Sequence, residues 1–318
     1  MHWARIGEAG FLGGIRFLHW LYHHGGIWPF RVALCVVMPW FFLRNGLARR
    51  ASLEYLARLS EASGGGTTPA PNWWNAFRHF LCFGESVLEK LIAADLRESV
   101  QEPVVAEGRE SLHRLVDAGR GAVVMSAHFG NYTFLRQLWR NQHSHVRFIL
   151  LTHTRHAGRF NQFLHTRNPE ATVDLIHVDD VDVGTAMMLS ECVAAGDIVV
   201  LAGDRIPVAP GAKGTVATPF LGKEAHFPIG PYVLAAALGC PVFMVFGARC
   251  RNGFSITVRQ LAERVVLPRR GREAAIRIYL DAYVATLTEA CIRYPLQWFN
   301  FYPFWNEHAN EKPPKPLA

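Results

Sequence analysis

From residue 104 onward, short apolar runs rich in β-branched side chains alternate with segments of helical periodicity, and this alternation constrains the fold most. Strands are expected at 121–126, 146–152, 172–178, 197–202 and 241–247, and helices at 107–118, 131–141, 155–166, 183–195, 229–238 and 272–292. The alternation predicts an α/β fold with a mixed, mostly parallel sheet flanked by helices. Arg251, Asn252 and Gly253, between two apolar runs, predict a hairpin turn at the far edge of that sheet.

The N-terminal region has a different pattern, an uninterrupted apolar run at 32–43 that is bracketed by Arg31 and Arg44. This run is shorter than the roughly 20 residues that a helix needs to cross a bilayer. Aromatic and basic side chains mix at 11–30, which suits a helix lying in the headgroup layer. A hairpin packed on its own domain is the alternative. We therefore expect an N-terminal membrane-anchoring helical hairpin at 1–59.

Residues 60–72 combine glycine, serine and proline without an apolar cluster, which predicts a flexible linker. The α/β domain then occupies 73–318. The chain has 33 Lys and Arg residues, of which only five are lysine, and its net charge is +7 at pH 7. This excess of arginine favours anionic partners, with phospholipid, nucleic acid and an acidic carrier protein fitting equally well.

Ligands of open α/β sheets collect at the carboxyl ends of the strands, so the loop after strand 121–126 is the first place to expect a site. There His128 precedes Gly130, which permits a turn, and the position suits a general base at the mouth of a pocket. A histidine that only caps or fills the turn is the alternative. Asp204 similarly follows the strand expected at 197–202.

Four segments share an order and spacing that resemble the lysophospholipid acyltransferase superfamily, specifically the lipid A late acyltransferase (lauroyl/myristoyl transferase) branch: the loop around His128, Gly203–Arg205, Phe220–Pro231 and Trp298–Trp305. The resemblance covers nearly the whole chain. It implies an acyltransferase at a cell inner membrane, and Arg44, Arg49 and Arg50 just after the apolar run indicate the cytoplasmic face. Such an enzyme moves a fatty acyl group from acyl carrier protein or acyl-CoA to a hydroxyl of a glycolipid or lysolipid, and needs no metal or organic cofactor.

In that family a His-x4-Asp/Glu pair does the chemistry, and His128 matches its base. The fifth residue after it, however, is Thr133, and a hydroxyl cannot compensate the charge of an imidazolium. Three interpretations remain open. Thr133 holds the tautomer in a slower enzyme, a carboxylate such as Asp204 or Glu224 replaces the family acid, or the chain is a catalytically inactive lipid-binding relative. A hydrolase that gives the acyl group to water is a further alternative.

Substrate binding is assigned to polar and glycine residues near these segments. Arg155 and Arg159 lie one helical turn apart and would share a face able to hold phosphate, although a solvated helix face explains them equally well. Arg205 follows a strand end, beside Asp204. The remaining candidate substrate-binding residues are Asn131, Gly222 and Gly230.

Other chemistries lack a motif in this sequence. The histidines between 143 and 165 do not have the spacing of a zinc site, so no metal site is expected. There is no GxSxG, Walker A or GxGxxG motif, which removes support for a serine hydrolase, a P-loop enzyme or a dinucleotide oxidoreductase. Nucleic-acid binding is not expected either, because a lipid surface accounts for the positive charge.

Overall fold

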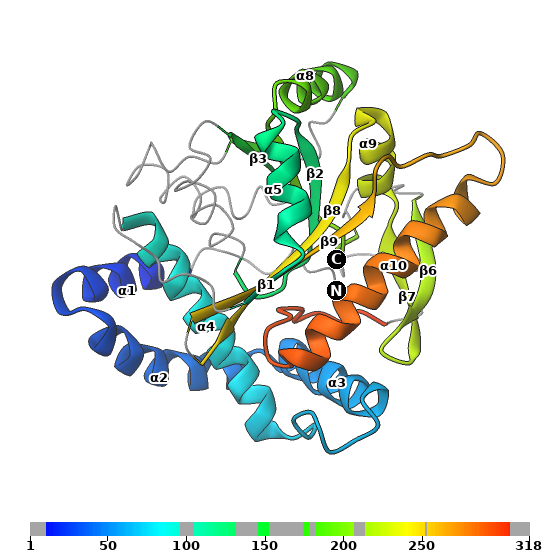
Figure 1. The fold of residues 1–318 in the computed structure, drawn as a ribbon. Helices are drawn as coiled ribbons and strands as arrows, with labels where there is room; N and C mark the ends of the chain where they lie inside the picture. Colours follow the sequence, from blue (N-terminus) through cyan, green and yellow to red (C-terminus); the bar gives the residue numbers. More distant parts are fainter. Residues whose placement is uncertain are drawn as a thin grey trace, which may run out of the picture.

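A computed structural model describes residues 11–95, 105–131, 146–152, 174–177, 182–206, 214–251 and 253–305. Its centre is a seven-stranded sheet in the order β1-β9-β8-β2-β5-β3-β4 (Figure 1). The strands are β1 Val105–Glu107, β2 Ala122–Ser126, β3 Phe148–Thr152, β4 Asp174–His177, β5 Ile198–Ala202, β8 Val242–Cys250 and β9 Gly253–Ala262. The chain thus has the mixed α/β architecture with a mostly parallel sheet that the alternating pattern predicts.

Five neighbouring strands, from β8 to β4, run parallel, whereas β9 is antiparallel to β8 and β1 pairs parallel to β9. The predicted hairpin joins β8 and β9, but its placement at the far edge of the sheet is wrong. The three-residue strand β1 pairs with β9 at 105–107 and forms that edge instead. A strand of this length is too short to show a periodic pattern in the sequence, so only its pairing with β9 identifies it.

Alternate residues of the central strands face opposite sides of the sheet, and both sides are buried. In β2, Val123 and Met125 join the larger hydrophobic cluster, whereas Ala122 and Val124 join a second cluster together with Leu112 of α5. Strands buried on both faces read as continuous apolar runs, which is why the sequence pattern was clear for β2 and its neighbours.

The helices around the sheet mostly match the predicted ranges. They are α5 Arg109–Asp117, α8 Val183–Ala194, α9 Gly230–Leu238 and α10 Arg272–Arg293. The helices predicted at 131–141 and 155–166 lie outside the described residues, except Asn131, which is not helical. A separate hairpin of β6 Thr215–Phe220 and β7 Lys223–Pro228 packs against α10. At its tip Leu221 and Gly222 both have positive φ (49° and 80°), as a tight two-residue turn requires.

The N-terminal region contains three described helices where the sequence predicts a hairpin. They are α1 Phe11–Gly25, α2 Ile27–Arg44 and α3 Gly46–Ala62, and α4 Trp73–Asp95 follows them. Figure 1 shows α1 to α4 gathered along one end of the sheet. Residues of α2, α3 and α4 belong to the same hydrophobic cluster as one face of the sheet. The division of the chain at 60–72 stays a prediction; α3 extends into that range and turns and bends follow it.

Candidate active site

Two loops begin side by side at the carboxyl ends of β2 and β5. The register pairs Ser126, the last residue of β2, with Ala202, the last residue of β5. The carbonyl of Ser126 accepts hydrogen bonds from the Gly203 N–H at 2.8 Å and from the Tyr283 hydroxyl at 2.8 Å. The residues that follow each strand therefore start from fixed and adjacent positions.

The segment Ala127–Asn131, here called the histidine loop, is held between β8 and the residues at 297–305, here called the closing aromatic stretch. Its Gly130 has φ +53°, and a Cβ there would lie 1.9 Å from the Gly247 carbonyl oxygen, so only glycine fits. The Gly130 N–H donates to the Gln297 carbonyl at 2.7 Å, and the Phe299 N–H donates to the His128 carbonyl at 2.7 Å. These contacts fix the backbone at and after His128.

His128 and Asp204 are joined by two hydrogen bonds. The His128 Nδ1 lies 2.8 Å from Asp204 Oδ1, and the His128 backbone N–H donates to Oδ2 at 2.9 Å. The carboxylate is 1% exposed, whereas the histidine side chain is 35% exposed. Because an ionised carboxylate only accepts, Nδ1 carries the proton in the neutral ring and Nε2 carries the lone pair. The pair thus has the tautomer that a general base needs.

The charge of Asp204 is maintained despite its burial. Burial alone raises the pKa of this carboxyl, but the adjacent His128 and the guanidinium of Arg205 outweigh that effect and hold the pKa below its usual value. Arg205 is itself desolvated, which lowers the pKa of its guanidinium, and it donates to the Phe299 carbonyl at 3.1 Å. A buried carboxylate at this position would stabilise an imidazolium forming on His128.

The sequence-predicted residues divide into those that the structure brings together and those that it does not. His128 and Asp204 are in direct contact, and Asp204 is the carboxylate that the second open interpretation requires. Asn131 ends the histidine loop, and its N–H donates to the Gly247 carbonyl at 3.3 Å. Thr133, Arg155 and Arg159 lie outside the described residues, so their roles stay predictions.

The two glycines assigned to substrate binding have roles in chain geometry. Gly222 forms the tip of the β6–β7 hairpin, and Gly230 is the first residue of α9. Their assignment to substrate binding likewise stays a prediction, as does that of Arg205. Among the residues that the structure describes, no group of three His, Cys, Asp or Glu side chains is placed to hold a metal ion.

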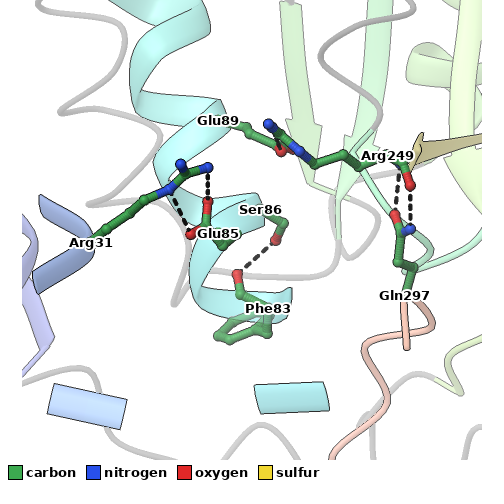
Figure 2. A network of polar contacts seen from close by, with 7 residues as sticks. All are labelled: Arg31, Phe83, Glu85, Ser86, Glu89, Arg249 and Gln297. Atoms are coloured by element: carbon green, nitrogen blue, oxygen red, sulfur yellow. Dashed lines mark hydrogen bonds and ion pairs between the residues drawn. The ribbon is translucent and has the colours of Figure 1, made fainter. Parts of the chain in front are cut away.

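A polar network on α4, which the sequence did not indicate, joins α2 on one side and β8 with Gln297 on the other (Figure 2). Arg31 of α2 makes a two-pronged contact with Glu85, at 3.1 and 3.3 Å, and one turn later the buried Glu89 pairs with Arg249 of β8. The Gln297 side chain accepts from the Arg249 N–H at 2.7 Å and donates to its carbonyl at 2.6 Å. The Gln297 carbonyl also accepts a hydrogen bond from the histidine loop. Polar contacts therefore link α2 to α4, α4 to β8, and β8 through Gln297 to that loop.

His79 of α4 is a second functional candidate that sequence analysis missed. It is fully buried, its Nε2 lies 2.9 Å from the Trp298 carbonyl, and its Nδ1 lies 2.9 Å from the Ser52 hydroxyl. A carbonyl only accepts, so Nε2 carries the proton and Nδ1 accepts from Ser52. Burial lowers the pKa of His79 to about 4, although the bond to Trp298 opposes the shift. The ring is therefore neutral at pH 7.

This burial predicts an acid-sensitive fold. Between pH 6.5 and about 4 the unfolded chain binds a proton at His79 that the folded chain does not, so the free energy of unfolding falls as pH falls. The lowered pKa of His79 corresponds to a fall of about 3 kcal/mol in the free energy of unfolding over that interval. Urea unfolding of the protein and of His79→Gln, at pH 7 and pH 4.5, measures it. The variant should lose less stability on acidification, and equal losses would contradict a neutral, buried His79.

No family model matches the chain, and no curated protein matches it. The resemblance to lipid A late acyltransferases therefore stays an expectation from the quoted motifs. The geometry around His128 is the independent observation on which a function can be argued.

Proposed function

We propose that this protein is a membrane-associated acyltransferase, which moves a fatty acyl group from an acyl thioester to a hydroxyl of a glycolipid or lysolipid. The donor is acyl carrier protein or acyl-CoA, with the resemblance favouring the carrier protein. The observation that carries the proposal is the 2.8 Å contact between His128 Nδ1 and the buried Asp204 carboxylate, at the carboxyl ends of two parallel strands. This contact supports the interpretation in which Asp204 serves as the acid partner in place of Thr133.

In the proposed reaction His128 Nε2 removes the proton of the acceptor hydroxyl as its oxygen attacks the thioester carbonyl. Asp204 stabilises the resulting imidazolium. When the tetrahedral intermediate collapses, the carbon–sulfur bond breaks, and the imidazolium gives its proton to the departing thiolate. The products are an acyl ester and a free thiol, so His128 ends in its starting state. Because the donor thioester is already activated, no nucleophilic side chain and no cofactor is required.

The proposed site of action is the cytoplasmic face of the inner membrane, with α2 as the anchor. Among the described residues, α2 is the helix long and apolar enough to span a membrane, a test that soluble core helices also pass. Its two faces differ: Phe30, Leu34, Met38 and Phe42 are buried in the core, whereas Val32, Val36, Trp40 and Leu43 are 63–71% exposed. Since one face is packed along its length, including against α4, we propose that α2 lies in the membrane plane and inserts the other face.

Aromatic and basic side chains surround the exposed face of α2. Arg44 lies 5.9 Å from the ring of Trp40, and Arg49 lies 4.7 Å from the ring of Trp73. Trp73 and Trp74 are themselves more than half exposed. Tryptophan and arginine at the rim of an apolar surface favour the headgroup region of an anionic bilayer.

Weakening this face should detach the protein from membranes without unfolding it. We expect Val36→Ser with Trp40→Ser to lower the vesicle partition coefficient roughly 30-fold, because each exposed side chain gains about 1 kcal/mol by insertion. The measurement is co-sedimentation with vesicles of phosphatidylethanolamine and phosphatidylglycerol. Ile278→Ser is the matched control, since Ile278 is 71% exposed but lies on α10. Equal binding of all three proteins would refute insertion through α2.

The acyl transfer itself is tested by lipid mass spectrometry. Cells that express the protein and matched cells that express His128→Ala are extracted, with equal amounts of membrane-bound protein. A lipid heavier by one acyl chain, present only with the unaltered protein, would support the proposal and identify the acceptor. Identical lipid profiles in a host that makes the acceptor would instead favour the catalytically inactive lipid-binding relative. Free fatty acid without acylated lipid would indicate a hydrolase.

A further inference from the structure

The Asp204 carboxylate has a third hydrogen-bond donor besides the two of His128. The indole Nε1–H of Trp298 donates to Asp204 Oδ2 at 3.0 Å. This leaves Oδ1 for the imidazole and makes Oδ2 the atom that the protein scaffold holds. Oδ2 therefore accepts from two donors, the His128 N–H and the indole, and the indole is the one that comes from outside the histidine loop. It helps to fix the carboxylate rotamer, and with it the orientation of Oδ1.

Trp298 is held by aromatic packing and by two hydrogen bonds to its carbonyl, one of them from the Asn300 N–H at 2.9 Å. It is fully buried, with its ring edge-on to Tyr55 and Phe220 at centroid distances of 5.1 Å each. Its carbonyl accepts from the Nε2–H of His79, whose other ring nitrogen is occupied by Ser52. The ring of His79 in turn packs against Phe301 at 4.6 Å. His79 of α4 thus contacts the backbone of the residue whose indole meets Asp204.

We propose that Trp298 and His79 are positioning residues for the His128–Asp204 pair: His79 holds the Trp298 backbone, and the Trp298 indole fixes the carboxylate rotamer that faces His128. This role rests on the proposed acyl transfer, because it assigns no separate reaction to either residue. It extends the site from two residues to a chain of hydrogen bonds that runs from α3 through α4 and the closing aromatic stretch to the base.

The other titratable groups that face Asp204 do not compete for this role. Arg205 is the adjacent cation, and the hydroxyls of Tyr283 and Tyr302 and the thiol of Cys291 are neutral because burial raises their pKa values. The charge on Asp204 is therefore shared among His128, Arg205 and the indole N–H. Removing the indole donor concentrates that charge toward His128.

The test compares two tryptophan-to-phenylalanine variants that remove the same atoms from the same aromatic cluster. Trp298→Phe removes the donor to Asp204. Trp305→Phe is the matched control, because Trp305 is 3% exposed, lies 6.0 Å from Trp298 between ring centroids and donates to the Phe220 carbonyl instead. A merely structural role predicts similar effects of both changes.

We expect Trp298→Phe to lower kcat about tenfold or more with little change in KM, since hydrogen bonds to charged groups are the strong ones. The acid limb of its pH–rate profile should move toward higher pH by roughly half a unit. A carboxylate that has lost one hydrogen-bond donor stabilises the imidazolium more strongly and so raises the pKa of His128. Trp305→Phe should leave that limb in place. Equal shifts, or no shift in either variant, would overturn the positioning role.

Two variants of His79 keep the test decisive if Trp298→Phe does not fold. His79→Gln retains an N–H that can donate to the Trp298 carbonyl, whereas His79→Leu does not. The positioning role predicts that the leucine variant reproduces the altered pH profile and that the glutamine variant restores the original one. Indistinguishable pH profiles of the two variants would contradict it.

An observation independent of activity separates this inference from the proposed function. The ring signals of His128 are identified by their loss in His128→Ala and followed by NMR of histidine-labelled protein in detergent between pH 5 and 9. A titration midpoint that moves in Trp298→Phe but not in Trp305→Phe supports the positioning role even if no acyl transfer is found. If the wild-type protein is active and the titration midpoint of His128 is the same in Trp298→Phe and Trp305→Phe, the positioning role is refuted and the proposed function stands.

Discussion

His128→Ala is expected to lower the rate of acyl transfer about 10³-fold, the loss typical of removing a positioned general base. The ring of His128 is partly exposed while its Nδ1 is engaged by a buried carboxylate, so the substitution removes the base without opening the core. The measurement is the steady-state transfer of a labelled acyl group from a thioester to extracted lipid, with the protein in vesicles.

A matched control is available on the β6–β7 hairpin. His226 is partly buried, and its Nδ1 lies 3.3 Å from the Thr215 hydroxyl. His226→Ala should keep most of the transfer rate, and added imidazole should partly restore His128→Ala by entering the vacated space. Folded and membrane-bound His128→Ala with an undiminished rate would remove His128 from the mechanism.

Replacing Asp204 by asparagine should be nearly as damaging, with a loss of about 10³- to 10⁴-fold. The carboxylate accepts three hydrogen bonds, two from His128 and one from Trp298, and an amide has only one oxygen to offer them. If the amide N–H faces Nδ1, the ring proton moves to Nε2 and the lone pair needed for catalysis is lost. The change is nearly isosteric, so the protein should still fold.

Thr133 provides the contrast that identifies the acid. If Asp204 has the role that the family assigns to the fifth residue after the histidine, Thr133→Ala should change the rate by no more than a few-fold. Thr133→Glu should bring no large gain, because Nδ1 of His128 is already bonded. Kinetics of Asp204→Asn and Thr133→Ala under the same conditions decide the matter. A larger loss in Thr133→Ala than in Asp204→Asn would reverse the assignment.

The elements that sequence analysis placed well are those whose burial leaves a pattern in the chain. Strands β2, β5 and β8 are continuous apolar runs because both of their faces are covered, and α10 is a long helix that begins and ends within one residue of the predicted range. The strand β1 and the number of N-terminal helices were not predicted. In both cases the boundary depends on contacts with distant residues, which local periodicity does not record.

The same distinction applies to the site. The position of His128, just past a buried strand and before a glycine, follows from the order of residues and the general geometry of α/β sheets. Asp204 was one of two carboxylates that remained possible beside Thr133. The structure places it in contact with His128 because β2 and β5 are adjacent strands that end at paired residues, which brings His128 and Asp204 within 2.8 Å of each other.

The sequence by itself determined the α/β architecture, the apolar N-terminal surface and the position of His128 at a strand end, because each depends on the burial or chemistry of residues near one another in the chain. Only the tertiary structure decided which carboxylate contacts His128. It also decided that Trp298 contacts that carboxylate and that His79 contacts Trp298. Those contacts join residues 76 and more positions apart, through hydrogen bonds whose partners depend on strand order and helix packing. The order of residues along the chain does not specify these partners, because they are set by how the strands and helices assemble.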